Sequence, residues 1–105
     1  MLHVMIDDVK DGINYDLIAR TSMAGLFLLE ALQGRQFELY IDFDLGSGSI
    51  NGNQIIKLGL KKKWLPNKIT VVSWNPVGRK AIAATLRDAG YMTATASGST
   101  FEKGT

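Results

Sequence analysis

The chain has 105 residues, enough for one domain that buries about two-thirds of its unfolded surface without disulfides. It contains no cysteine, which excludes disulfides and thiolate chemistry and fits a reducing compartment, so we expect a cytoplasmic protein. The formal charge of +2 is too small to indicate nucleic-acid binding. No apolar stretch approaches the ~18 residues of a membrane span, and acids follow the first six residues, so neither a membrane nor export is expected.

Strands and helices alternate from the N-terminus onward. Residues 2–6 (LHVMI) form an apolar, β-branched run, and residues 15–20 (YDLIAR) form a weaker strand candidate. Thr21 or Ser22 is a suitable N-cap for a helix over residues 23–33, whose apolar residues recur with helical spacing.

The pattern continues through the second half of the chain. Residues 37–43 (FELYIDF) predict the third strand, and the helix over residues 54–64 follows the turn residues Gly52 and Asn53. Residues 69–73 (ITVVS) predict the fourth strand.

The last predicted helix begins at Pro76, which suits the first helical turn, and ends at residue 88 before Gly90. Residues 91–96 (YMTATA) predict the fifth strand. We therefore expect one domain over residues 1–96 and a loose tail over residues 97–105.

Several of these strands are apolar throughout, which predicts a mostly parallel sheet covered by helices on both faces. The expected fold is a receiver- or flavodoxin-like α/β three-layer sandwich with a five-stranded sheet in the order 2-1-3-4-5. Only residues 7–14 separate the first two strands, which is short for a crossover helix. The first helix is therefore expected to be short or absent, and the direction of the second strand stays open.

Polar residues follow three of the predicted strands. A carboxylate inside a buried strand would cost several kcal/mol, so the acids must stand at strand ends. In such sheets the functional crevice lies at the carboxyl ends of the strands, where these side chains would meet. They are Asp7 and Asp8 after the first strand, Asp42 and Asp44 at the end of the third, and Ser73 and Asn75 after the fourth.

Carboxylates gathered at one rim repel one another, and a divalent cation relieves that repulsion. Oxygen ligands suit Mg²⁺, Mn²⁺ or Ca²⁺ and not zinc, and the predicted ligands are Asp7, Asp8 and Asp42. The ion would bind a phosphate oxygen while Ser73, Asn75 and the amides from Gly46 to Gly52 donate hydrogen bonds. The alternative is that these residues cap helices and loops, with Ser73 or Asn75 at the helix that begins with Pro76.

Trp74 lies in the loop after the fourth strand. Its indole either stacks on a base at the rim or packs on the domain surface or on a dimer partner. A homodimer is therefore compatible with the sequence.

Four short strings carry a resemblance to a known family. They are Asp7-Asp8-Val9-Lys10, Arg20-Thr21, Ile41-Asp42-Phe43-Asp44-Leu45-Gly46 and Val72-Ser73-Trp74-Asn75-Pro76-Val77-Gly78. They resemble the cyclic-phosphate processing receivers, relatives of the response-regulator receivers, which carry Asp-Asp-x-Arg, Arg-Thr, Leu-Asp-His-Asp-Leu-Gly and His-Ser-x-Asn-Pro-x-Gly. The resemblance spans residues 4 to about 90. It implies an acidic, metal-capable pocket for a cyclic phosphate or nucleotide-like substrate, with Arg20 and Lys10 among the ligand-binding residues.

The chain departs from that pattern at three positions. Phe43 and Val72 stand where the family has histidines, and Lys10 replaces an arginine, which keeps the charge and loses the bidentate fork. The only histidine, His3, lies inside the first predicted strand. If the family uses a histidine pair as general acid and base, this chain has lost that route.

Three functions stay open. The first is an enzyme or degenerate enzyme for a small phosphate-bearing ligand, with Asp42, Asp44 and Ser73 as candidate catalytic residues. The second is a non-catalytic interaction or regulatory module. The third is a phosphoacceptor receiver with Asp42 as acceptor, Asp7 and Asp8 as Mg²⁺ ligands and Ser73 as switch hydroxyl. That function needs a lysine just after the fifth predicted strand, and Lys103 comes too late in the sequence.

Overall fold

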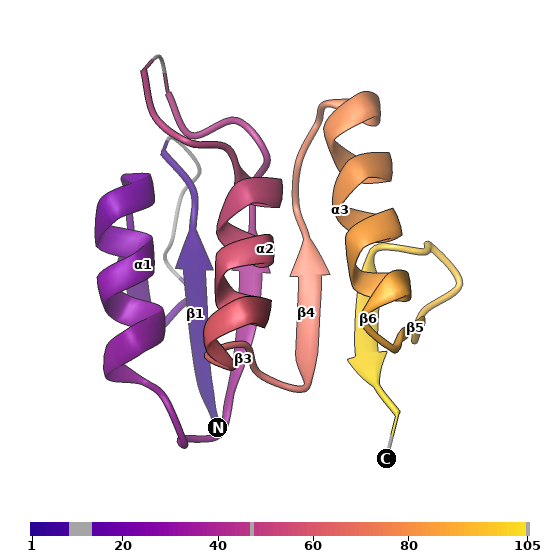
Figure 1. Ribbon diagram of the computed structural model, residues 1–105, viewed down its shortest axis with the longest axis horizontal. Coiled ribbons are helices and arrows are strands. Elements are labelled where there is room, and N and C mark those ends of the chain that lie inside the picture. The colour runs from indigo at the N-terminus through magenta and orange to yellow at the C-terminus, as the bar shows by residue number, and fades with distance from the viewer. Residues whose placement is uncertain (9–13, 47, 105) are drawn as a thin grey trace.

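Figure 1 shows the computed structural model, which describes residues 1–8, 14–46 and 48–104. The strands are β1 (Leu2–Ile6), β2 (Leu17–Ala19), β3 (Phe37–Ile41), β4 (Lys68–Val71), β5 (Tyr91–Thr93) and β6 (Thr100–Lys103). The helices are α1 (Ser22–Ala31), α2 (Gly52–Lys62) and α3 (Pro76–Asp88). Strands β2, β1, β3 and β4 are mutually parallel, β6 is antiparallel to β4, and β5 is antiparallel to β6. The mostly parallel sheet confirms the receiver- or flavodoxin-like α/β fold class.

Each helix begins at a side-chain cap. Thr21 Oγ1 accepts from the amide of Ala24 at 3.1 Å and begins α1. Asn51 and Gln54 form a reciprocal capping box at α2. Asn75 caps α3, followed by a proline at its first position. None of the described helices has the length and apolar character needed to cross a membrane.

The C-terminal segment differs from the prediction of a loose tail. It forms β6, which lies between β4 and β5 and gives the sheet order β2-β1-β3-β4-β6-β5 in place of 2-1-3-4-5. Phe101 pairs with Ile69 and is only 1% exposed. Burial of this ring orders a segment whose surrounding glycines and serines are typical of a loop.

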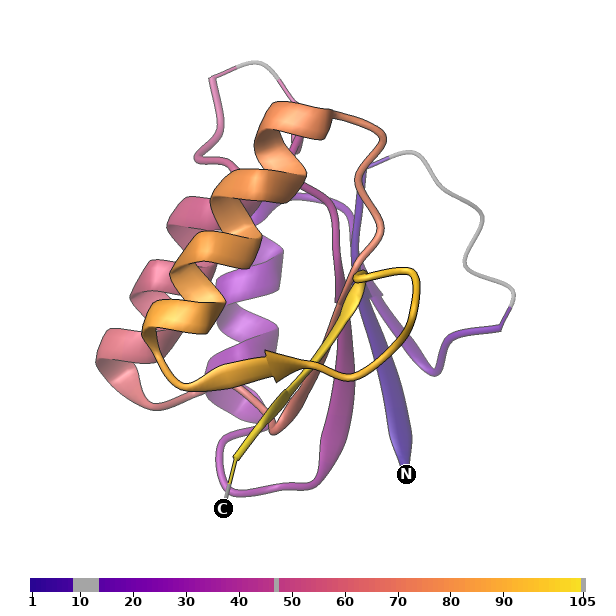
Figure 2. The ribbon, with the colours of Figure 1, turned by 90° about the vertical axis from the view of Figure 1, so that its right-hand side faces the viewer.

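The helices all lie on one face of the sheet, as Figures 1 and 2 show. The three-layer arrangement that we expected is therefore wrong for the described residues, which form two layers. Strand β3 gives the reason: Phe37, Leu39 and Ile41 are buried, whereas Glu38 and Tyr40 alternate with them and are only half-buried. The question whether a short first helix exists falls mostly on residues 9–13, outside the described residues. The direction of the second strand, which the sequence left open, is parallel to β1.

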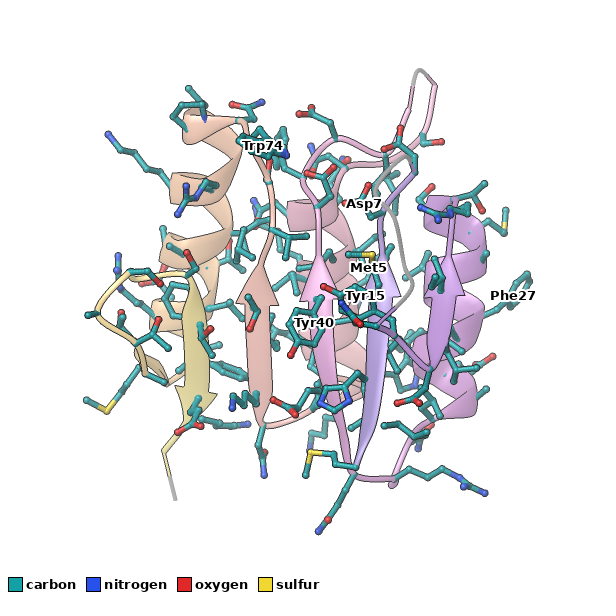
Figure 3. All side chains as sticks on the ribbon, turned by 180° about the vertical axis from the view of Figure 1, so that it is seen from behind. Met5, Asp7, Tyr15, Phe27, Tyr40 and Trp74 are labelled. Atoms are coloured by element: carbon teal, nitrogen blue, oxygen red, sulfur yellow. The ribbon has the colours of Figure 1, made fainter. Side chains whose placement is uncertain are left out.

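The face without helices carries polar and aromatic groups. His3 Nε2 and Lys68 Nζ lie 3.0 and 3.1 Å from the two carboxylate oxygens of Glu38. The hydrogen bond that the Lys68 ammonium donates to the Glu38 carboxylate raises the pKa of Lys68. Tyr15 and Tyr40 meet edge to face, with ring centroids 5.0 Å apart, above the same face that Figure 3 views. These groups make the face compatible with solvent.

Candidate functional site

The carboxyl ends of β1, β3 and β4 lie at one level, so the residues that follow them meet at one rim. The amide of Asp42 donates to the carbonyl of Ile6 at 3.0 Å, and the amide of Val72 donates to the carbonyl of Ile41 at 3.0 Å. The parallel ladder therefore extends one residue past each strand and fixes the relative heights of the neighbouring chain segments.

Three carboxylates converge at this rim. One ligand oxygen from each of Asp7, Asp8 and Asp42 can be chosen so that all three lie within 4.8 Å of one another. Asp7 and Asp42 are buried, at 0% and 6% exposure, and Asp8 is half-buried. The Oδ1 atom of Asp42 also accepts from the amide of Phe43 at 2.8 Å. The three acids that the sequence predicts as metal ligands therefore lie together.

Asp44 lies beside this cluster and is not part of it. Its carboxylate is exposed, and its Oδ2 atom is 3.5 Å from Asn75 Nδ2. The contact joins the loop after β3 to the loop after β4. Asp44 therefore stands apart from the group of three acids that could hold a metal ion.

Ser73 and Asn75 have structural partners at the start of α3. Ser73 is buried, and its Oγ accepts from the amide of Asn75 at 3.1 Å. Asn75 Oδ1 accepts from the amides of Val77 and Gly78 at 3.0 and 3.2 Å. The capping alternative is therefore correct for Asn75, whose side-chain nitrogen stays directed at Asp44.

Of the other residues predicted to bind a ligand, Arg20, Gly46 and Trp74 lie at or near the rim. Arg20 Nη1 donates to the carbonyl oxygen of Asp7 at 3.2 Å and brings a cation to the acids. Gly46 has a left-handed φ of 98°, and a Cβ there would stand 3.9 Å from Asp8 Oδ2, so its loop passes close to that acid. Trp74 projects at the same end of the sheet (Figure 3). Lys10 lies outside the described residues.

Gly52 and Gly78 shape the rim through close contacts that the sequence did not predict. A Cβ at Gly52 would overlap the carbonyl oxygen of Asp42, so α2 can begin directly against the backbone of that acid. A Cβ at Gly78 would overlap the ring of Phe43. Each glycine lies at the start of a predicted helix, which could have drawn attention to it. Its contact with the segment after β3 depends on how separate parts of the chain pack, which the local sequence does not show.

A comparison with protein families agrees with the four sequence strings. The family model described as the cyclic-phosphate processing receiver domain matches residues 2–88. The chain belongs to this family. The match contains β1 to β4 and α1 to α3 and ends before β5 and β6. No curated protein and no solved structure matches the chain significantly.

Proposed function

We propose that this receiver domain binds a divalent cation, Mg²⁺ or Mn²⁺, through Asp7, Asp8 and Asp42, and that the cation holds a phosphate oxygen of a cyclic-nucleotide-like ligand. The observation that carries the proposal is the convergence of three carboxylate oxygens within 4.8 Å. Two oxygens on opposite sides of one Mg²⁺ stand about 4.2 Å apart, so small side-chain rotations suffice to bring all three onto an ion.

The donor set fits such an ion. All three ligands are carboxylates, and hard oxygen donors favour Mg²⁺ and Mn²⁺ over zinc. When bound, the ion supplies Lewis acidity toward a phosphoryl oxygen. Asn75 Nδ2 and Arg20 would orient the remaining phosphate oxygens, since both already donate to groups at this rim.

Binding is favoured over efficient turnover. The only histidine, His3, lies 3.0 Å from Glu38 at the amino ends of the strands, so no imidazole reaches the rim as a general acid or base. Asp42, Asp44 and Ser73 stay as the candidate catalytic residues. We therefore place the protein among catalytically degenerate or binding members of the family, with a regulatory role as the alternative.

A phosphoacceptor role for Asp42 is less well supported. That chemistry needs a lysine beside the acceptor, and the amide of Lys103 donates to the carbonyl of Asn67, just before β4. Lys103 therefore lies at the opposite end of the sheet from Asp42, which follows β3.

Thermal unfolding with a panel of metals and nucleotides tests the proposal. We expect Mg²⁺ or Mn²⁺ alone to raise Tm by several degrees, and cyclic AMP or AMP to raise it further only with metal, because a ligand that binds the native state stabilises it by mass action. Asp42→Asn should abolish the metal response. Asp88→Asn, an equal charge change at the exposed end of α3, should retain it.

Two results would contradict the proposal. One is a wild-type protein whose Tm does not respond to any divalent cation at saturating concentration. The other is an equal metal response in the wild type and in Asp42→Asn, which would assign the ion to a different site.

A further inference from the structure

A basic groove runs between α3 and the segment that joins β5 to β6. We call it the α3 groove; it has a volume of about 430 Å³ and is lined by Pro76, Arg79, Lys80, Ala83, Arg87 and Gly98. Arg79 and Lys80 come from one turn of the helix and Arg87 from about two turns further on, a rise of about 12 Å between Arg79 and Arg87. The lining residues that the structure describes include no acidic side chain.

The two arginines of this groove contact neutral groups. Arg79 Nη2 donates to Ser99 Oγ at 3.1 Å, and Arg87 Nη2 donates to Thr93 Oγ1 at 3.5 Å. The guanidinium of Arg87 also lies 5.6 Å from the ring centroid of Phe101. Among the described residues, no carboxylate forms an ion pair with Arg79, Lys80 or Arg87. The two arginines are therefore positioned by neutral groups, and none of the three cations is neutralised by an ion pair with a described carboxylate.

Trp74 continues the groove toward the rim. A smaller hollow of about 210 Å³ is lined by Val71, Val72, Ser73, Trp74, Arg79 and Ser99, and Arg79 belongs to both hollows. The indole is 87% exposed, the highest value among the large apolar side chains that the structure describes. An exposed flat ring beside a row of cations combines a stacking surface with a track for phosphates.

We propose that the α3 groove binds single-stranded nucleic acid, with a base stacked on Trp74 and backbone phosphates along Arg79, Lys80 and Arg87. An acidic peptide would use the cations but would gain little from the indole, so the ring favours nucleic acid. The strand would then leave its phosphate-bearing end at the acidic rim, through Ser73 and Asn75. Only this last placement rests on the proposed function; the groove itself does not.

Fluorescence anisotropy with a 5′-labelled single-stranded RNA of about ten nucleotides, in EDTA, tests the proposal. We expect binding that weakens with salt. The slope of the logarithm of the binding constant against log[salt] should be about −2 for three phosphate contacts. Lys80→Gln/Arg87→Gln should reduce this slope by about 1.4. Lys61→Gln/Lys62→Gln removes the same charge from exposed positions at the end of α2 and should leave the slope unchanged.

The indole is tested separately. Trp74→Ala should weaken binding about tenfold without changing the salt slope, and Trp74→Phe should restore most of the affinity. Because the indole is exposed, both variants should fold, which their Tm values would check. Because the RNA assay is carried out in EDTA and the metal assay without RNA, a failed metal site and a failed groove give different results.

Three outcomes would overturn the proposal. They are an absence of RNA binding at low salt, equal effects of the two lysine-containing double variants, and displacement of the RNA by a polyglutamate peptide as effectively as by unlabelled RNA. The last result would assign the groove to an acidic protein partner.

Discussion

Phe43 and Gly78 show how single residues fix the geometry next to the rim. Phe43 follows Asp42, and its ring occupies the space that a side chain at position 78 would need. Helix propensity alone favours alanine over glycine in α3 by about 1 kcal/mol. We expect Gly78→Ala to destabilise the protein by about 1 to 3 kcal/mol nevertheless, because the ring must move.

Urea unfolding of a double-mutant cycle measures this coupling. In the Phe43→Ala background, Gly78→Ala should become neutral or stabilising, since the obstructing ring is gone. Equal costs of Gly78→Ala in both backgrounds would show that Phe43 is not the cause.

Tyr91 is a residue whose burial predicts a pH dependence. Its hydroxyl donates to the carbonyl of Pro66 at 2.6 Å, and burial raises its pKa to about 12 from an ordinary 10.0. The unfolded chain therefore loses this proton at lower pH than the folded chain. The contribution of Tyr91 is complete below pH ~10 and is lost as the pH rises toward 12, by an amount on the order of 2 kcal/mol.

Urea unfolding at intervals from pH 9 to 12 checks this prediction. The free energy of unfolding of the wild type should fall more steeply with pH than that of Tyr91→Phe, which lacks the titrating hydroxyl. Parallel curves for the two proteins would contradict it.

Strand β6 is the element on which sequence and structure differ most. The helices and the first four strands could be predicted because their caps and apolar runs are local features. Strand β6 could not, since only four residues form it and its stability comes from inserting between β4 and β5. The two-layer arrangement could have been predicted from β3, because buried and half-buried residues alternate along its sequence FELYI. We instead interpreted this strand as apolar throughout and buried on both faces.

The burial of Phe101 predicts how much β6 contributes. Phe101→Ala should lower the free energy of unfolding by about 3 to 5 kcal/mol, because the ring is fully buried against the core. Glu102→Ala, at the next and exposed position, should change it by about 0.5 kcal/mol or less. Chemical denaturation measures both. A small cost for Phe101→Ala would mean that the tail is loose, as the sequence first suggested.

For the whole molecule, a parallel sheet brings together residues that are far apart in the chain. Asp7, Asp8 and Asp42 could be predicted as a cluster because the carboxyl ends of parallel strands share one edge. The α3 groove could not be predicted, because the net charge of +2 averages over all surfaces and hides a local row of three cations. The separation of Asp44 from the other acids depends on the path of its loop, which no sequence pattern encodes.

The position of a bound cation is the most direct test of the proposed metal site. Mn²⁺ broadens NMR signals near its site, so substoichiometric Mn²⁺ should first remove the amide signals of Asp7, Asp8 and Asp42 from a ¹⁵N spectrum. Asp42→Asn keeps an oxygen that can accept from the amide of Phe43 and should fold, with unchanged or higher stability because one repelling charge is gone, but it should lose this broadening. Broadening centred on Glu38 and Glu102, or none at the rim, would contradict the proposed metal site.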